Sequence, residues 1–275
     1  MQTKGLDYSR NNSQTPEDDS RLSICEFADT ILEVSTLLLE SGAHCERINR
    51  NIHRIAQTTA YNVDMLISFT AISITVVDKT NLTHVVTANR SIKHHGAHFG
   101  VLTDTSLLTW KVFDGDISFN ELRQYLEELK NTPRYSIWLV RLFIGIACGC
   151  LCLLAGGNSI DGAFTFAASL LGLSVRQEMV KRRFNLMISI LCSAFVTTTI
   201  SGLNVLYGLG NAPEVSVATA VLFLIPGVPL INSIIDLLEG YIPIGIARGA
   251  FGGFILLCIA VGMFLSMSLI GVKYF

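Results

Sequence analysis

The feature that most constrains this chain is the near absence of charge from its second half. Residues 135–275 contain 7 Lys and Arg and 5 Asp and Glu, whereas residues 1–134 contain 13 and 17. Only 15% of the chain is charged, against about 25% in an average soluble protein. The second half is therefore predicted to be a membrane domain (135–275), and a one-domain cytosolic enzyme is excluded.

Five stretches of the second half are candidates for transmembrane helices, since about 20 predominantly apolar residues cross a hydrocarbon core of roughly 30 Å. The second stretch is the weakest, because only 14 uncharged residues separate Asp161 from Arg176. It spans the bilayer only if one of these two residues lies at a membrane boundary or inside it. The predicted spans are about 137–156, 159–178, 184–207, 214–235 and 245–272.

The basic residues of the second half predict its orientation. Positively charged residues concentrate in cytoplasmic loops, and here they precede the first span, lie between the second and third, and lie between the fourth and fifth. The N-terminal domain is therefore predicted to be cytoplasmic and the C-terminus external. Residues 1–20 are polar and acidic, so we expect a disordered tail.

Residues 21–134 predict a small α+β domain. Apolar residues at helical spacing indicate helices over 22–41, 44–60, 102–113 and 118–129, and alternation indicates strands over 72–76 and 82–88. Ser118 and Glu121 have the spacing of a capping box. The predicted fold class is thus an α+β cytoplasmic domain followed by an α-helical membrane domain of five transmembrane helices.

Several classes of partner and chemistry have no support in the sequence. The first half carries a net charge of −4 without a basic stripe, which argues against nucleic acid. His94 and His98 have metal-ligand spacing but no acidic or thiol ligand nearby, so we expect no metal. No cofactor, ATP-binding or hydrolase motif is present, so no catalytic residues are assigned.

The fourth predicted span contains a helix break beside polar residues. Pro226, Gly227 and Pro229 prevent a regular helix there, because proline lacks a backbone N–H. Asn232 and Asp236 are four residues apart and share a face just beyond the break. Many secondary transporters build substrate sites from such broken helices. The alternative is a packing kink without a substrate.

Charged residues within or next to spans are also candidates for substrate binding or coupling, because a charge at the bilayer centre costs roughly 3 kcal/mol. Asp236 and Arg248 form the available pair for the ammonium and carboxylate groups of a zwitterion. A dicarboxylate would instead favour Arg248 and a helix N-terminus. For Asp161, Asp236 and Arg248 alike, the alternative is a helix end in the headgroup zone.

The third predicted span carries a stripe of small and polar residues, which includes Thr197, Ser201 and Asn204. This stripe either lines a hydrophilic path or packs closely against a neighbouring helix. The fifth span begins with Gly245, Gly249 and Gly253, for which packing is predicted.

Three segments together resemble the threonine/serine exporter family. They are Leu38–Ile48, Thr197–Gly202, and Pro226–Ser233 with its continuation to Asp236, Gly240 and Arg248. The resemblance covers nearly the whole chain from about residue 21. Glu46 and Arg47 match the family's Glu-Arg signature in the second helix, although an exposed ion pair of little energetic value would look the same.

The resemblance implies a bacterial inner-membrane secondary transporter that exports threonine and serine. Five spans correspond to the split form of the family, which requires a smaller companion membrane protein. Members of the split form are associated with succinate export, which is the alternative substrate. The expected partners are the companion, the lipid bilayer and a small-molecule substrate, and a homo-oligomer is left open. A membrane-anchored enzyme and a regulatory subunit without a substrate path are the competing classes.

Overall fold

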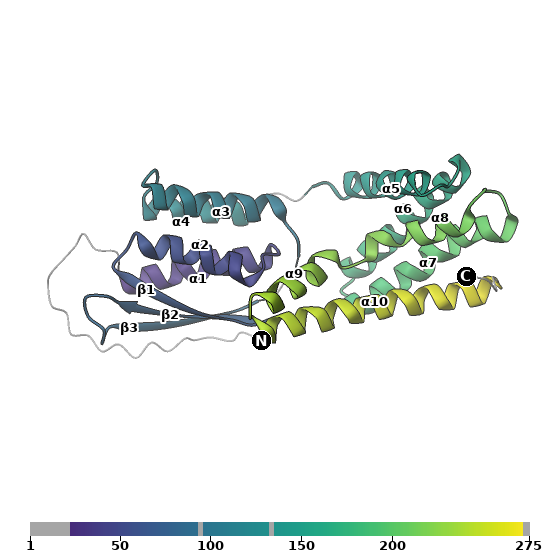
Figure 1. Ribbon diagram of the computed structural model, residues 1–275. Coiled ribbons are helices and arrows are strands. Elements are labelled where there is room, and N and C mark those ends of the chain that lie inside the picture. The colour runs from purple at the N-terminus through teal and green to yellow at the C-terminus, as the bar shows by residue number, and fades with distance from the viewer. Residues whose placement is uncertain (1–22, 93–95, 132–134, 272–275) are drawn as a thin grey trace.

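The chain forms an α+β unit and a helical bundle that lie end to end in the computed structural model (Figure 1). The structure describes residues 23–92, 96–131 and 135–271. The predicted disordered tail and His94 lie outside these described residues.

The α+β unit contains one three-stranded antiparallel sheet with strand order β1-β2-β3. The strands are β1 (Tyr61–Ile67), β2 (Ala71–Asp78) and β3 (Val85–Ser91). Strands β2 and β3 were predicted from the sequence, whereas β1 was not. Its alternation is short, with Tyr61 and Val63 the two residues of β1 that are buried.

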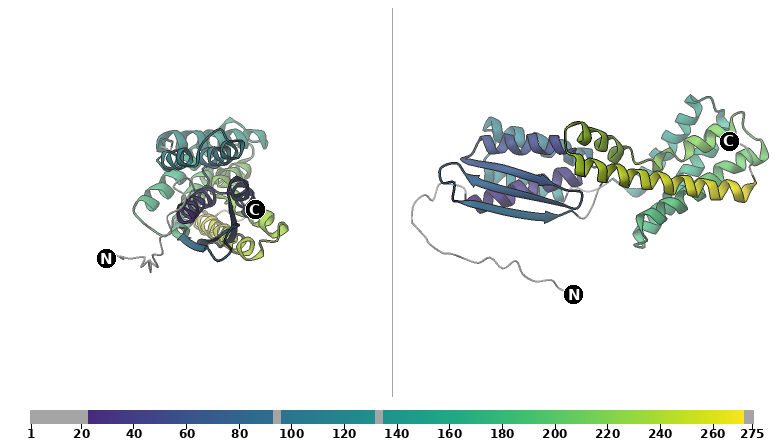
Figure 2. Two further views of the ribbon diagram at one scale, coloured as in Figure 1. Left: turned by 90° about the vertical axis from the view of Figure 1, so that its left-hand side faces the viewer. Right: turned by 60° about the horizontal axis from the view of Figure 1, so that its bottom comes forward.

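Four helices complete the unit: α1 (Ile24–Glu40), α2 (Cys45–Gln57), α3 (Phe99–Asp114) and α4 (Phe119–Lys130). Helices α1 and α2 cover one face of the sheet, and α3 and α4 lie beyond them (Figures 1 and 2). Phe27, Ile52 and Ile74 are completely buried in the shared core. The predicted capping box is confirmed at the start of α4, where Ser118 and Glu121 bond each other's backbone N–H groups.

The bundle follows with a different, mostly apolar composition. Its elements are α5 (Ile137–Leu154), α6 (Ser159–Lys181), α7 (Leu186–Tyr207), α8 (Pro213–Ala220), the 3₁₀ turn η1 (Leu222–Leu224), α9 (Gly227–Leu238) and α10 (Ile242–Ile270). Helices α5, α6, α7 and α10 pack in sequence, with α8 beside α6 and α7.

Three helices of the described chain, α5, α7 and α10, are long and apolar enough to cross a membrane. A fourth crossing requires α8 with η1 and α9 to act together, although they meet at 65°. Helix α6 does not reach the same hydropathy, because Arg176, Gln177 and Glu178 lie within its last two turns. The five-span count therefore stays a prediction, with three spans or four supported by length and composition.

The predicted break in span 214–235 is confirmed. A 3₁₀ turn ends at Leu224, and α9 begins in a new direction at Gly227. Pro229 is tolerated in α9 because it lies in the first turn, where its missing N–H would have no intrahelical acceptor.

Helices α9 and α10 form an antiparallel hairpin at the end of the bundle that faces the α+β unit (Figure 1). A Cβ on Gly245 would meet Leu237 at 2.8 Å, and one on Gly249 would meet the Ser233 Oγ at 2.7 Å. Packing is thus confirmed for these two glycines. The prediction was wrong for Gly253, whose Cβ position is open within 4 Å.

Helix α10 is longer than one membrane crossing requires. Its 29 residues extend about 43 Å at 1.5 Å per residue, against roughly 30 Å of hydrocarbon. The excess length is used at its N-terminal end, where Ile244 is 2% exposed and belongs to the core of the α+β unit. The hairpin is therefore shared between the two units.

We expect a reporter fused after Phe275 to lie on the opposite side of the membrane from one fused within residues 1–20. The physical reason is that α10 runs from the α+β unit to the far end of the bundle (Figure 1). Paired phosphatase and fluorescent-protein fusions measure this. If both ends reported the same side, the α8–α9 segment would be a re-entrant loop and the five-span count would be wrong.

Candidate functional site

The junction between α1 and α2 is the centre of the site. Gly42 adopts φ +94°, a left-handed conformation that L side chains rarely adopt. A Cβ at this position would lie 3.1 Å from the Gly96 carbonyl oxygen and 3.3 Å from Val228. This sharp turn lets α2 begin shortly afterwards, at Cys45, whose backbone N–H is directed at the α9–α10 hairpin.

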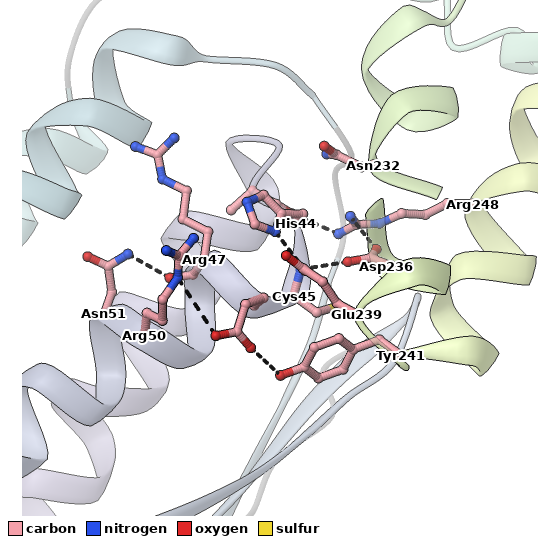
Figure 3. A network of polar contacts seen from close by, with 12 residues as sticks. His44, Cys45, Arg47, Arg50, Asn51, Asn232, Asp236, Glu239, Tyr241 and Arg248 are labelled. Carbon is pink, nitrogen blue, oxygen red and sulfur yellow. Dashed lines mark hydrogen bonds and ion pairs between the residues drawn. The ribbon is translucent and has the colours of Figure 1, made fainter. Parts of the chain in front are cut away.

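Three side chains of the hairpin bind this junction, and we call this arrangement the clasp (Figure 3). The Asp236 carboxylate accepts from the Cys45 backbone N–H at 2.7 Å and from the Arg248 guanidinium at 2.8 Å. Arg248 also donates to the Ala43 carbonyl at 2.9 Å. The Asn232 amide donates to the Gly42 carbonyl at 2.8 Å. Segments almost 200 residues apart in sequence are joined this way.

The clasp is a buried ion pair with additional hydrogen bonds. Asp236 is 0% exposed and Arg248 is 5% exposed. The Asp236 carboxylate lies at the N-terminus of α2, where the helix dipole favours a negative charge. Removing one partner of such a pair leaves an uncompensated buried charge, which costs roughly 3–5 kcal/mol. The clasp therefore holds the two units together.

The family-signature residues Glu46 and Arg47 lie beside the clasp and bind different neighbours. Glu46 accepts from the Tyr241 hydroxyl at 3.1 Å, and burial together with this hydrogen bond raises the pKa of Tyr241 to about 12. Arg47 donates to Ser106 of α3 at 3.1 Å. They therefore anchor α2 to the hairpin and to α3 rather than forming an isolated surface pair.

One cluster near the clasp has the composition of a metal site. Ligand atoms of His44, Asp236 and Glu239 lie within 4.8 Å of one another. However, Asp236 already binds Arg248 and the Cys45 N–H, and His44 bonds Glu239 at 3.1 Å. These contacts account for the cluster without an ion. His98 caps α3 by accepting from the Val101 N–H.

A cavity of about 240 Å³ lies beside the clasp, between the α+β unit and the break before α9. Its lining comes from both units: Leu39, Gly42, Phe69, Gly96, Ala97, Arg176, Leu186, Ile190, Phe223, Leu224, Ile225, Pro226, Val228, Pro229, Asn232, Arg248, Phe251 and Ile255. Most of these side chains are apolar. The predicted candidates Pro226, Asn232 and Arg248 thus meet at one cavity, whereas Asp236 is bound to the start of α2.

Two lining residues were missed by the sequence analysis as site residues. From the sequence, Arg176 was interpreted only as a possible boundary of the second span. Its charge at the end of an apolar stretch was the feature that could have marked it as a site residue. Phe69 lies in the turn between β1 and β2, and its ring is 5.5 Å from that of Phe251 on α10. No local pattern marks Phe69, because its neighbour is 182 residues away.

Asp161 and Asn204 lie together at the far end of the bundle. The buried Asp161 carboxylate accepts from the Asn204 amide at 2.7 Å and from the backbone N–H groups of Asn158, Asn211 and Ala212. Gly210 packs so closely that an added Cβ would collide with this carboxylate. These hydrogen bonds hold the α5–α6 and α7–α8 turns together. Asp161 therefore stabilises the bundle at a place away from the cavity.

The polar stripe of α7 is buried against α6. The Ser193 hydroxyl donates to the Gly172 carbonyl at 2.7 Å, and a Cβ on Gly172 would overlap the Thr197 Oγ. Ser201 is completely buried and donates to the Thr197 carbonyl at 3.0 Å. The stripe is therefore a close-packing face, which was one of the two alternatives, and it does not line the cavity described above.

Residues 29–270 match the family described as "Putative threonine/serine exporter" (ThrE). The chain belongs to this exporter family. The match includes every residue of the clasp and spans both units. Because the family is one of transporters, the competing reading as a membrane-anchored enzyme is set aside.

Two named relatives of the exporter family are of similar length. The "Probable succinate transporter subunit YjjP" of Klebsiella aerogenes is 28% identical over 88% of this chain and 93% of the relative. The protein of the same name from Escherichia coli K12 is also 28% identical, over 88% of this chain and 94% of the relative.

A longer relative is named for threonine and serine instead of succinate. The "Probable threonine/serine exporter" of Mycobacterium tuberculosis is 25% identical over 87% of this chain but only 45% of the relative. No solved structure matches the chain.

We expect Cys45 to resist alkylation in the native protein and to become reactive when the clasp is broken. Cys45 is completely buried, and burial together with the nearby Asp236 raises the pKa of its thiol. Arg248→Gln removes the ion pair, so the alkylation rate of Cys45 should rise at least about ten-fold. Peptide mass spectrometry after iodoacetamide treatment measures the rate at each cysteine.

Three controls make this result specific. Cys25 is exposed and should react in every variant, whereas Cys152 is buried within the bundle and should stay protected unless the whole protein unfolds. Arg182→Gln removes an exposed ion pair with Glu178 and should leave Cys45 protected. If Cys45 were alkylated equally slowly in Arg248→Gln and in the protein without the substitution, the clasp would not be what holds the two units together.

Proposed function

We propose that the chain is a subunit of a secondary transporter that exports a small polar metabolite through the bacterial inner membrane. The observation that carries this proposal is the cavity at the helix break, which is lined jointly by the α+β unit and the bundle. In the proposed orientation the α+β unit is cytoplasmic and the C-terminus external. The cavity is then the place where a cytoplasmic substrate meets the membrane domain.

The clasp connects the cavity to the α+β unit. Broken helices in transporters place polar groups and free helix ends at the substrate, and here α9 is such a half-helix. Because Asn232 and Arg248 both line the cavity and bind the α1–α2 junction, a change at the cavity is transmitted to the α+β unit. We therefore assign Asn232, Asp236 and Arg248 to coupling between the two units.

The other predicted site residues fall into groups according to the part of the structure that they contact. Pro226 and Gly227 create the break and its cavity, and Glu46 and Arg47 hold α2 in place beside the clasp. Asp161, Thr197, Ser201 and Asn204 are assigned to helix packing and turn fixation, because their contacts are within the bundle. We propose this assignment over the substrate-binding role, which the sequence left open beside helix packing for the α7 stripe and beside a helix end for Asp161.

Two substrate classes are supported by the names of the relatives. Threonine and serine are the expectation from the family, and succinate is the alternative from the relatives of similar length. We further propose that the chain works with a smaller companion membrane protein. Its support is the word "subunit" in the names of those relatives, together with the 45% coverage of the longer exporter.

We expect the chain expressed alone to export neither metabolite and co-expression with the companion to restore export. The physical reason is that a transport path requires helices on all sides of a polar route. Metabolite profiling of the medium from strains lacking one, the other or both proteins measures this. Full transport by the purified single chain in liposomes would contradict the need for a companion.

Export should also depend on the charge of Asp236. Asp236→Asn keeps the size of the side chain but leaves Arg248 without its counter-ion, so export should be abolished while membrane insertion persists. Arg248→Gln should act similarly, and Asp236→Glu should retain partial activity. Transport and the membrane level of each variant are measured together. Normal export by Asp236→Asn at a normal level would refute the coupling role.

A further inference from the structure

Arg176 of α6 is a positively charged side chain that lines the cavity without a partner. It is partly buried, and no hydrogen-bond acceptor or ion-pair partner contacts it among the described residues. Arg248, which lines the same cavity, is bonded to Asp236 and to the Ala43 carbonyl. Guanidinium groups in low-polarity surroundings are normally paired. Arg176 is therefore available to a ligand.

The other groups around the cavity leave the charge of Arg176 uncompensated. The Arg248 charge is neutralised by Asp236 at 2.8 Å. No Asp or Glu occurs among the described residues that line the cavity. The lining around Arg176 consists largely of leucine, isoleucine, phenylalanine and proline side chains. The cavity is thus apolar with a net positive charge.

The start of α9 adds to this positive potential. Pro226 and Val228 line the cavity where α9 begins, and the N-terminus of a helix carries a partial positive charge. Pro229 contributes no N–H, while the Gly227 N–H is used by the Ile225 carbonyl. The helix end is therefore a secondary contribution beside the full charge of Arg176.

We infer that the cavity binds a small carboxylate anion without an ammonium group, and that Arg176 holds its carboxylate. This inference rests on the proposed transport function and favours succinate over threonine and serine. The second carboxylate of succinate would lie toward the start of α9, where the helix end adds positive potential. A guanidinium binds a carboxylate through two parallel hydrogen bonds, and apolar surroundings strengthen the pair. The ammonium group of an amino acid would find no carboxylate in the described lining and would be repelled by Arg176.

The size of the cavity agrees with such a ligand. Its volume of about 240 Å³ is below the roughly 300–1,000 Å³ of sites for drug-sized molecules. A metabolite of a few carbon atoms fits this volume. Arg176 is accordingly a specificity-determining residue, distinct from the clasp that joins the two units.

The binding test uses the purified full-length chain and measures thermal stabilisation by succinate, threonine and inorganic phosphate. A ligand that binds the folded state raises the midpoint of unfolding, and at equal ligand concentration the tighter ligand raises it further, with the logarithm of its affinity. Succinate should stabilise the chain more than threonine or phosphate does. Arg176→Gln should weaken succinate binding at least about ten-fold, and Arg176→Lys, which keeps the charge but loses the planar fork, should weaken it less.

Lys181→Gln is the matched control, because it removes a positive charge from an exposed position on the same helix. It should bind succinate like the unmodified chain. Unchanged succinate binding by Arg176→Gln would overturn the inference, as would equal or stronger stabilisation by threonine. Equal stabilisation by phosphate would mean that the cavity takes any anion, lipid headgroup phosphates included, and would overturn the assignment to a carboxylate.

Transport in membrane vesicles with the companion separates this inference from the proposed function. If succinate is transported, and transport is lost in Arg176→Gln but kept in Lys181→Gln, both the transport function and the binding site at Arg176 are supported. Transport of threonine that Arg176→Gln leaves intact overturns the inference while the transporter function stands. Succinate binding that requires Arg176, without transport of either metabolite, upholds the binding site and overturns the transport function.

Discussion

The buried ion pair between Asp236 and Arg248 is the interaction on which the arrangement of the two units depends. Each partner also bonds the backbone of the α1–α2 junction, so neither charge is left without hydrogen bonds in a buried position. A pair of this kind gives a defined geometry more than it gives stability, because desolvation offsets much of the attraction. The observed placement of the α9–α10 hairpin satisfies all these groups at once, and residues of the hairpin line the cavity.

The helix break gives the clasp and the cavity a common origin. A continuous helix through Pro226 would keep Asp236 in line with α8, whereas the 65° bend turns α9 toward the α+β unit. The cavity lies at this bend, and α6, α7 and the turn that carries Phe69 contribute to its lining. In this way one local feature of the backbone positions both the coupling residues and the proposed anion site.

Charges within the bundle fall into two groups that differ in their partners. Asp161 accepts four hydrogen bonds and Arg248 has a carboxylate and a carbonyl, so both are satisfied by the protein itself. Arg176 has no such partner in the described part of the chain. The charges that the protein itself satisfies serve the fold, whereas Arg176, which is partly buried and lines the cavity, is the group that a ligand would complete.

Hydropathy and local motifs alone predict the division into a charged α+β unit and an apolar bundle, the capping box of α4 and the break at Pro226. Each of these depends on residues that are neighbours along the chain, through hydropathy, side-chain reach or a missing N–H. Three-dimensional packing, by contrast, brings Asp236 and Arg248 together at the start of α2, packs Thr197 against Gly172 and places Arg176 at the cavity. These contacts join segments up to about 200 residues apart. Hydropathy can place a charged residue at a membrane boundary, but it cannot identify the residue that the charge binds.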